Sequence, residues 1–268
     1  MADFEGKVAL VTGAAMGIGR GIAEAFLEEG ASVASVDIDG AAARTTASEI
    51  ASDAAKHLVV EGDVSNIDDV KRIVDATVTE FGGLDILVNN AGIQPASSYL
   101  TAEDLPEEVW DRILNVNLKA HYLTARFAIP EIRKRGGGAI VNIASVQGLQ
   151  SQARVPAYAA SKGGVLSLTR QLALDYAAEG IRVVAVCPGA IDTPLLRNSV
   201  TGSVQDLEEA VKGWAGSHPM RRIGTPAEIA NVVLFLASDR ASFMTGEYVC
   251  VDGGMMALGA WAGSPADW

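Results

Sequence analysis

A run of small residues, Thr12–Gly19, follows the first strongly apolar segment of the chain. Its glycines have the spacing G-x3-G-x-G, which differs from the commoner G-x-G-x-x-G. Small residues let a backbone approach a pyrophosphate closely, and the start of a helix presents free N–H groups to it. The run therefore predicts a dinucleotide-binding turn, with a plain glycine-rich turn as the alternative. The cofactor-contacting positions expected in it are Gly13, Met16, Gly17, Ile18 and Gly19.

An acidic residue ends the next apolar segment. Asp37 lies about 20 residues beyond the glycine turn, where an acid can accept hydrogen bonds from the adenosine ribose hydroxyls. A carboxylate here would repel the 2′-phosphate of NADP, and neither Met16 nor Ile38 supplies a compensating cation. The sequence therefore predicts NAD as the cofactor, with an ordinary turn residue as the alternative reading of Asp37.

The third and fourth apolar segments also end in residues suited to a cofactor. Asp63 and Val64 follow the third, where a carboxylate can meet the adenine amino group. Asn90, Ala91 and Gly92 follow the fourth, where a tight turn of small residues would flank the cofactor. In a parallel sheet these ends share one edge, which is where such sheets bind ligands.

Histidine and cysteine provide no ligand set. His57, His121 and His218 lie on unrelated segments and match no metal spacing, so we expect structural roles for them and no metal. Cys187 and Cys250 each lie in an apolar run. We therefore expect two small buried side chains, not a disulfide framework or reactive thiols.

The elements that must position these residues alternate along the chain. Short, apolar, β-branched runs are typical of strands buried on both faces of a parallel sheet; they are Lys7–Thr12, Ser32–Asp37, His57–Glu61, Leu84–Asn89, Ala139–Ile143, Arg182–Cys187 and Glu247–Val251. Helix-like segments separate them at Gly17–Glu29, Ala41–Ala54, Ile67–Phe81, Pro106–Arg135, Pro156–Ala178 and Pro226–Leu236. Because parallel strands need crossover helices, the pattern predicts a Rossmann-type, doubly wound α/β sheet of about seven strands.

The chain of 268 residues has no Pro/Ser-rich linker and no internal repeat. We therefore expect one dinucleotide-binding and catalytic domain over residues 1–268. Its least regular stretch, residues 189–223, follows the sixth strand and holds a possible helix, Val204–Trp214. Long loops at this edge are usually functional, so the stretch is predicted to cover the substrate. Residues 255–268 form an apolar C-terminal tail.

Composition narrows the class of protein. With 49% apolar and 20% charged residues the chain is globular. A net charge of −12 disfavours nucleic acid and anionic membrane surfaces as partners. The N-terminus carries acids before a short apolar run, unlike a signal peptide, and no window approaches the roughly 18 apolar residues of a spanning helix. We expect a cytoplasmic protein.

Taken together, these motifs resemble the short-chain dehydrogenase/reductase family in its standard single-domain form. The resemblance covers nearly the whole chain, from about Phe4 to Met256. Beyond the segments above, it rests on Asn117, Ser145, Tyr158-Ala-Ala-Ser-Lys162, Pro188-Gly189, Thr193 and Asp252-Gly253-Gly254.

The resemblance implies a catalytic tetrad of Asn117, Ser145, Tyr158 and Lys162. Tyr158 would be the acid/base, and Lys162, four residues later on the same helix face, would favour its phenolate and hold the nicotinamide ribose. Ser145 would hydrogen-bond the substrate oxygen, and Asn117 would connect Lys162 through water to bulk solvent.

The family pattern also implies surroundings for the nicotinamide and an assembly. Pro188, Gly189, Ile191 and Thr193 should line the nicotinamide, with Thr193 on its carboxamide. Related enzymes pair on the two long helices and again near the last strand, so we expect a homotetramer, with a dimer as the alternative.

The activity expected is that of an NAD-dependent oxidoreductase moving hydride between nicotinamide and a secondary alcohol, with a sugar or polyol favoured. The favoured substrate follows from polar residues after the fourth and fifth strands, which exposed loop positions would also explain. Arg154 leaves open an acidic or sulfonated sugar. An NADPH-linked ketoacyl carrier reductase and an NAD-binding regulator without turnover are the competing hypotheses. The candidate substrate-binding residues are Gln94, Gln147, Gln152, Arg154 and Leu195.

Overall fold

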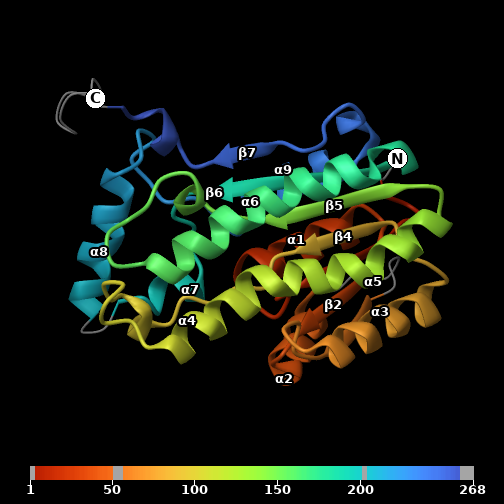
Figure 1. The fold of residues 1–268 in the computed structure, drawn as a ribbon, viewed down its shortest axis with the longest axis horizontal. Helices are drawn as coiled ribbons and strands as arrows, with labels where there is room; N and C mark the ends of the chain where they lie inside the picture. The colour runs from red at the N-terminus through yellow and green to blue at the C-terminus, as the bar shows by residue number, and fades with distance from the viewer. Residues whose placement is uncertain (1–3, 51–56, 201–203, 260–268) are drawn as a thin grey trace.

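The computed structural model describes residues 4–50, 57–200 and 204–259. One parallel sheet of seven strands runs through them in the order β3-β2-β1-β4-β5-β6-β7 (Figure 1). The strands are β1 Val8–Thr12, β2 Ser32–Asp37, β3 His57–Glu61, β4 Ile86–Asn89, β5 Gly138–Ile143, β6 Ile181–Pro188 and β7 Tyr248–Val251. The predicted doubly wound α/β fold is confirmed.

Helices cover both faces of this sheet. They are α1 Gly17–Glu28, α2 Gly40–Glu49, α3 Ile67–Phe81, α4 Glu107–Leu114, α5 Ala120–Lys134, α6 Pro156–Tyr176, α7 Pro194–Arg197, α8 Val204–Gly216 and α9 Pro226–Ala237. Alternate residues of β1 separate the two cores: Ala9 and Val11 pack with α1 and α9, whereas Val8 and Leu10 pack with α3, α5 and α6. Burial on both faces is why the strands read as unbroken apolar runs.

The strand order reverses between β1 and β4, which both pair with their neighbours in parallel. This is the switch point where an open α/β sheet forms a crevice at the carboxyl ends of its strands. In Figure 1 the strand arrows β5, β6 and β7 point toward the side where α7 and α8 lie. The segment predicted to cover the substrate therefore lies beyond the carboxyl ends of the strands.

Two predicted helices differ from those observed. The single long helix expected over Pro106–Arg135 is α4 and α5 joined by a π-helical turn, Asn115–Lys119. The helix expected over Ala41–Ala54 is observed as α2, and positions 51–54 lie outside the described residues, as do positions 201–203 of the covering segment and 260–268 of the tail.

A buried polar chain crosses the core between α5 and α6. Thr124 Oγ1 donates to Asn89 Oδ1 at 2.6 Å, and Asn89 Nδ2 donates to Asn142 Oδ1 at 2.9 Å. Asn142 Nδ2 then donates to Thr169 Oγ1 at 2.9 Å. Because each link is satisfied in a dry interior, the chain fixes the register of β4, β5 and the two helices that carry the site.

Candidate active site

The glycine turn has the close-packed backbone that its sequence predicts. Gly13 has φ +66° and Gly17 φ +57°, conformations that residues with a Cβ rarely adopt. A Cβ at Gly19 would collide with the carbonyl oxygen of Gly13. Met16 precedes α1 and makes no capping hydrogen bond with its side chain, so no side chain of the N-cap occupies the N–H groups of the first turn. That arrangement leaves them available to a pyrophosphate.

Asn90 supports this turn from the neighbouring strand. Its Nδ2 donates to the carbonyl oxygens of Thr12 at 2.9 Å and Gly13 at 3.1 Å. In return the Thr12 hydroxyl oxygen accepts from the backbone N–H groups of Asn90 and Ala91 at 3.0 and 3.1 Å. The side chain of Asn90 thus positions the glycine turn from the end of β4.

Asp37 lies where β2 ends beside the same turn. Its Oδ2 accepts from the N–H of Ala15 at 3.0 Å and its Oδ1 from the N–H of Asp39 at 3.0 Å. The neighbouring Met16 and Ile38 are 48% and 70% exposed. A ribose placed here would meet a fixed carboxylate flanked by two apolar side chains. These residues fit the ribose of an adenine dinucleotide.

Asp63 and Val64 contribute to the local structure after β3. Asp63 Oδ1 accepts from the N–H and the hydroxyl of Ser65 at 2.8 and 2.7 Å. Val64 is buried in the core between the sheet and α3. Any contact of Val64 with a cofactor would therefore come from its backbone.

The four predicted tetrad residues converge at the ends of β4 and β5. Lys162 Nζ donates to the carbonyl of Ile143 at 2.8 Å and lies 5.7 Å from the centroid of the Tyr158 ring. A Cβ added at Gly92 would be 3.6 Å from both Lys162 Nζ and Asn117 Oδ1. Because Gly92 has no side chain, the Lys162 ammonium and the Asn117 amide can both lie close to its backbone.

The π-helical turn explains how Asn117 reaches this place. Its Oδ1 accepts from the N–H of Ile93 at 2.8 Å, and its Nδ2 donates to the carbonyl of Ile93 at 2.9 Å. The wider turn presents the amide of Asn117 to the backbone after β4, and π-bulges of this kind are frequent at functional sites.

Burial shifts the pKa values of Tyr158 and Lys162 in opposite directions. Removal from water raises the pKa of the Tyr158 phenol to about 12, although its hydrogen bond with Ser145 opposes this shift. Burial lowers the pKa of the Lys162 ammonium to about 8. At neutral pH this site therefore holds a protonated phenol beside an ammonium that is close to losing its proton.

The segment after β6 returns to the glycine turn. A Cβ at Gly17 would be 3.2 Å from the Thr193 methyl group. The Thr193 hydroxyl donates to the carbonyl of Ile191 at 3.2 Å and accepts from the N–H of Leu196 at 3.3 Å. Thr193 thus begins α7 against the turn that would hold the pyrophosphate.

The candidate substrate residues divide into two groups. Nε2 of Gln94 and Oε1 of Gln147 are buried and have no hydrogen-bond partner in the described part of the protein. By contrast, Gln152, Arg154 and Leu195 are exposed. Arg154 has φ +66° and precedes α6, which begins at Pro156, so it does not share the helix of Tyr158.

Tyr99 is a neighbour of the site that the sequence reasoning missed. Burial raises the pKa of its phenol, and a hydrogen bond with Ser199 opposes this shift. Tyr99 also raises the pKa of Tyr158 through the repulsion of their negative forms. It therefore links the loop after β4 to the residues that follow α7, and no turn or spacing signal marks it.

The histidines and cysteines have structural surroundings. His57 Nε2 lies 2.8 Å from the Ser35 hydroxyl. Burial lowers the pKa of His121 to about 3, which keeps its imidazole neutral. Cys187 and Cys250 are register neighbours on β6 and β7, and both are free thiols. Burial raises the pKa of Cys187 to about 12. Cys250 is only partly buried, contrary to the expectation of a fully buried side chain.

Comparison with known proteins agrees with this geometry. The family model described as enoyl-(acyl carrier protein) reductase matches residues 13–256. An uncharacterized oxidoreductase of Thermotoga maritima is 43% identical over 96% of this chain and 100% of its own length. The chain belongs to the short-chain dehydrogenase/reductase family. The family's members are dehydrogenases and reductases that act on CH–OH groups with a nicotinamide cofactor, so this chain is an oxidoreductase.

Two further members of the family show how widely substrates differ among similar chains. The 3beta-hydroxysteroid dehydrogenase 2 of Eggerthella lenta is 41% identical over 94% of this chain and 95% of its own. The solved aldohexose dehydrogenase of Thermoplasma acidophilum is 41% identical, with a TM-score of 0.86 and 97% of each chain covered. Among the described residues, no helix is long and apolar enough to cross a membrane.

Proposed function

We propose that this protein is an NAD-dependent dehydrogenase of a secondary alcohol with further hydroxyl groups, such as a sugar or polyol. The observation that carries the cofactor choice is the Asp37 carboxylate, fixed beside the glycine turn by the Ala15 and Asp39 N–H groups. A 2′-phosphate would face this negative charge with only apolar neighbours at positions 16 and 38. NAD, which lacks that phosphate, meets no such repulsion.

The unpaired amide atoms of Gln94 and Gln147 support a substrate with more than one oxygen. A buried polar atom without a partner costs about 1–3 kcal/mol, so a glutamine side chain that turns toward a ligand and pairs with it gains affinity. Gln94 Nε2 is a donor and Gln147 Oε1 an acceptor. A hydroxyl group can pair with both, whereas a simple hydrocarbon ring can pair with neither.

The chain's own residues would divide the chemistry as follows. Ser145 and Tyr158 hydrogen-bond the substrate oxygen, and Tyr158 accepts the hydroxyl proton during oxidation. The positive charge of Lys162 stabilises the phenolate that this requires. Asn117, fixed by both polar groups of the Ile93 backbone, keeps its place beside Lys162. When bound, the nicotinamide supplies the hydride acceptor.

Assembly and location extend the proposal. Tyr122 on α5 and Leu174 on α6 are exposed apolar side chains, as is Tyr248 on the edge strand β7. Faces of this kind support a homotetramer assembled through the long helices and the last strand. Cys187 and Cys250, adjacent and unoxidised, fit the reducing cytoplasm.

Steady-state kinetics test the function directly. The purified protein is assayed with NAD and with NADP over a panel of aldoses, polyols, cyclohexanol and ketoacyl thioesters. We expect turnover with NAD and a polyhydroxylated alcohol. Preference for NADP with a ketoacyl thioester would instead make it a ketoacyl carrier reductase, and cofactor binding without turnover on any substrate would make it a regulator. Light scattering tests assembly, and a particle of 27.9 kDa would contradict both tetramer and dimer.

A further inference from the structure

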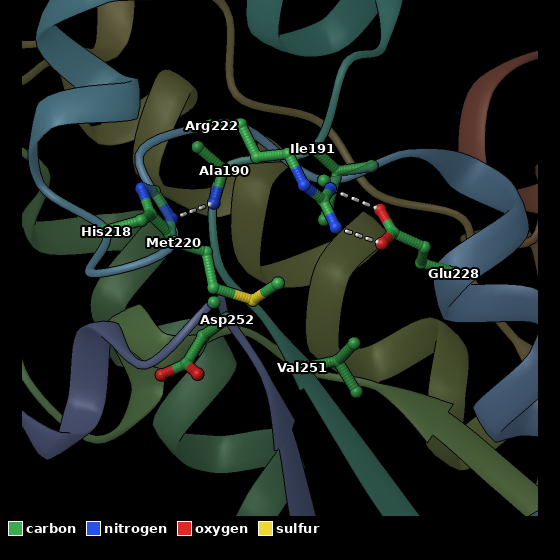
Figure 2. Close-up of a pocket in the computed structure, with 10 residues that line it drawn as sticks. Ala190, Ile191, His218, Met220, Arg222, Glu228, Val251 and Asp252 are labelled. Atoms are coloured by element: carbon green, nitrogen blue, oxygen red, sulfur yellow. Dashed lines mark hydrogen bonds and ion pairs between the residues drawn. The ribbon is translucent and has the colours of Figure 1, made fainter.

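His218 joins two segments that come from different parts of the chain. It is 2% exposed and follows α8 by two residues. The N–H of Ala190 donates to its Nε2 at 3.1 Å, as Figure 2 shows, and its Nδ1 lies 2.6 Å from the carbonyl oxygen of Trp214. Because Nε2 accepts, the ring proton is on Nδ1 and is donated to Trp214. The neutral imidazole is therefore satisfied at both nitrogens.

The two hydrogen-bond partners of His218 lie on different sides of the proposed ternary complex: Ala190 on the nicotinamide side and Trp214 on the substrate side. Ala190 follows Pro188 and Gly189, which are predicted to line the nicotinamide. A Cβ at Gly189 would be 2.7 Å from His218 Nε2, so the imidazole packs directly against this loop. Trp214 lies in the last turn of α8, beyond the carboxyl ends of the strands (Figure 1).

Packing alone does not hold the loop at this point. A cavity of about 100 Å³ lies beside it, lined by Ala190, Ile191, Met220 and Val251 among others (Figure 2). Arg222 and Glu228 on its wall bond to each other at 2.6 and 2.9 Å instead of to the loop. Where a void replaces contact atoms, dispersion forces restrain a segment weakly. The loop is held by hydrogen bonds instead: Gly224 N–H donates to the Ala190 carbonyl at 2.9 Å, and Ala190 N–H donates to His218 at 3.1 Å. Of these two bonds, the one to His218 leads to α8.

The loop at Gly189 and the segment that follows His218 are both hydrogen-bonded to the end of β7. Gly189 N–H donates to the carbonyl of Val251 at 3.1 Å, and Met220 N–H donates to that of Gly253 at 3.1 Å. These bonds tie both the loop and the residues after His218 to the end of β7. The loop and the segment after His218 therefore keep their relative places, which holds His218 Nε2 opposite the Ala190 N–H.

We propose that His218 is a positioning residue that couples nicotinamide binding at Gly189 and Ala190 to the placement of α8 over the substrate. This rests on the proposed function, because it needs the nicotinamide beside Gly189. A cofactor that fixes the Ala190 N–H fixes the imidazole, which then fixes the carbonyl end of α8. By linkage, a substrate held under α8 tightens cofactor binding by the same factor.

Two substitutions separate the two hydrogen bonds. His218→Asn keeps an amide N–H near the Nδ1 position, which can donate to Trp214, and has no atom near Nε2. His218→Gln extends an amide oxygen toward the Nε2 position, where it can accept from Ala190, and loses the bond to Trp214. Ser217→Ala is the matched control. It removes a hydroxyl that donates to the same Trp214 carbonyl at 2.7 Å and lies 3.2 Å from His218 Nδ1, and it keeps the imidazole with its bonds to Ala190 and Trp214.

Hydrogen–deuterium exchange with and without saturating NAD measures the coupling without a substrate. In the wild type and in Ser217→Ala, NAD should slow exchange at the glycine turn, in residues 189–192 and at the end of α8, the last by at least about fivefold. Both His218 variants should keep NAD protection of the glycine turn, and the protection of α8 should fall below about twofold. Thermal melting of each variant shows whether it is folded.

The outcomes separate this proposal from the proposed function. If NAD protects the glycine turn of the wild type and leaves α8 unchanged, the coupling is wrong while the dehydrogenase assignment stands. If the His218 variants retain full protection of α8, another contact carries the coupling and the proposal is also overturned. If NAD protects nothing, the proposed function fails and the coupling fails with it. Should the His218 variants not fold, the wild-type exchange alone decides between coupling and its absence.

Discussion

The carboxylate of Asp37 accepts a hydrogen bond from the backbone N–H of Ala15 at 3.0 Å, so the end of β2 is tied to the glycine turn. This bond fixes a negative charge where the adenosine ribose of a dinucleotide would lie. We expect NAD to be favoured over NADP by at least about tenfold in kcat/KM, which corresponds to about 1.4 kcal/mol. Asp37→Ala should narrow the ratio by removing the repulsion.

The control for Asp37 is a nearby acid with another task. Asp39 accepts from the N–H of Ala42 and caps α2. Asp39→Asn keeps a capping oxygen and removes one charge, so the cofactor ratio should stay within about twofold. Equal kcat/KM values for NAD and NADP in the wild type would show that Asp37 does not discriminate between them.

Tyr158→Phe keeps the ring and deletes the oxygen that we propose transfers the proton. We expect kcat to fall by about 10²–10⁴ while NADH still binds, as measured by quenching of protein fluorescence. Tyr176→Phe at the end of the same helix makes the same chemical change and should leave kcat unaltered. A Tyr158→Phe variant with near wild-type turnover would remove Tyr158 from the role of acid/base.

The pKa shifts at the site set the direction of the pH dependence. Burial raises the pKa of Tyr158 to about 12, so its phenolate is the minor form at neutral pH. Alcohol oxidation needs the phenolate and should accelerate as pH rises from about 6 to 8, by at most about tenfold per unit. Above about pH 8 the Lys162 ammonium, whose pKa burial lowers to about 8, loses its proton, so the acceleration should level off. Ketone reduction needs the protonated phenol and should not accelerate over this range. Initial rates in both directions, in buffers of constant ionic strength, test the sign; a flat oxidative profile contradicts it.

The strands could be predicted closely because one physical cause dominates them. β2 and β3 have the predicted bounds, since each is an apolar run between polar turns. The glycine turn could also be predicted from the sequence, because Gly13 and Gly17 occupy backbone conformations that a Cβ disfavours. Sequence-based prediction succeeds at positions where the backbone conformation or burial permits only a few residue types.

What could not be predicted depends on contacts distant in sequence. The segment Asn115–Lys119 contains neither glycine nor proline to mark a π-helical turn, and it is held by Asn117 bonding to Ile93 across the sheet edge. Tyr99, in the loop after β4, raises the pKa of Tyr158 although the two residues are far apart in the sequence. For His218 the sequence predicts only a structural role, because its partner Ala190 lies 28 residues earlier.

Glu228 offers a prediction about stability. Its carboxylate accepts from Arg222 at 2.6 and 2.9 Å and completes a capping box with Thr225 at the start of α9. These bonds, that with Arg222 first, lower its pKa to about 2. The stabilisation is therefore complete above the unfolded pKa of about 4.3 and is lost as pH falls through about 2.

Glu228→Gln should accordingly lower the free energy of unfolding by about 1 kcal/mol at pH 7, since the pair is partly exposed and one cap is weakened. In urea titrations the difference from the wild type should shrink as pH falls from about 5 toward 2. Glu49→Gln is the control, because Glu49 pairs with Arg20 on the surface and takes part in no capping box. A difference that grew toward low pH would have the wrong sign.

Substitution of Arg154 tests whether the substrate is neutral or anionic. It is exposed, lies before α6 and adopts φ +66°, a conformation that strains a residue with a Cβ. An exposed guanidinium contributes under about 1 kcal/mol to an ion pair, whereas one desolvated against a carboxylate or sulfonate contributes a few. For a neutral polyol, Arg154→Ala should leave the KM within about twofold and the NAD affinity unchanged. A rise in the KM of at least about tenfold, confined to acidic or sulfonated sugars, would instead place Arg154 over the substrate in the ternary complex.

Arg154→Gly separates the effect of backbone strain from the effect of the lost charge. Glycine relieves the strain at φ +66°, so this variant should have a higher melting temperature than Arg154→Ala. Its kinetics should match those of the alanine variant, because both lack the guanidinium.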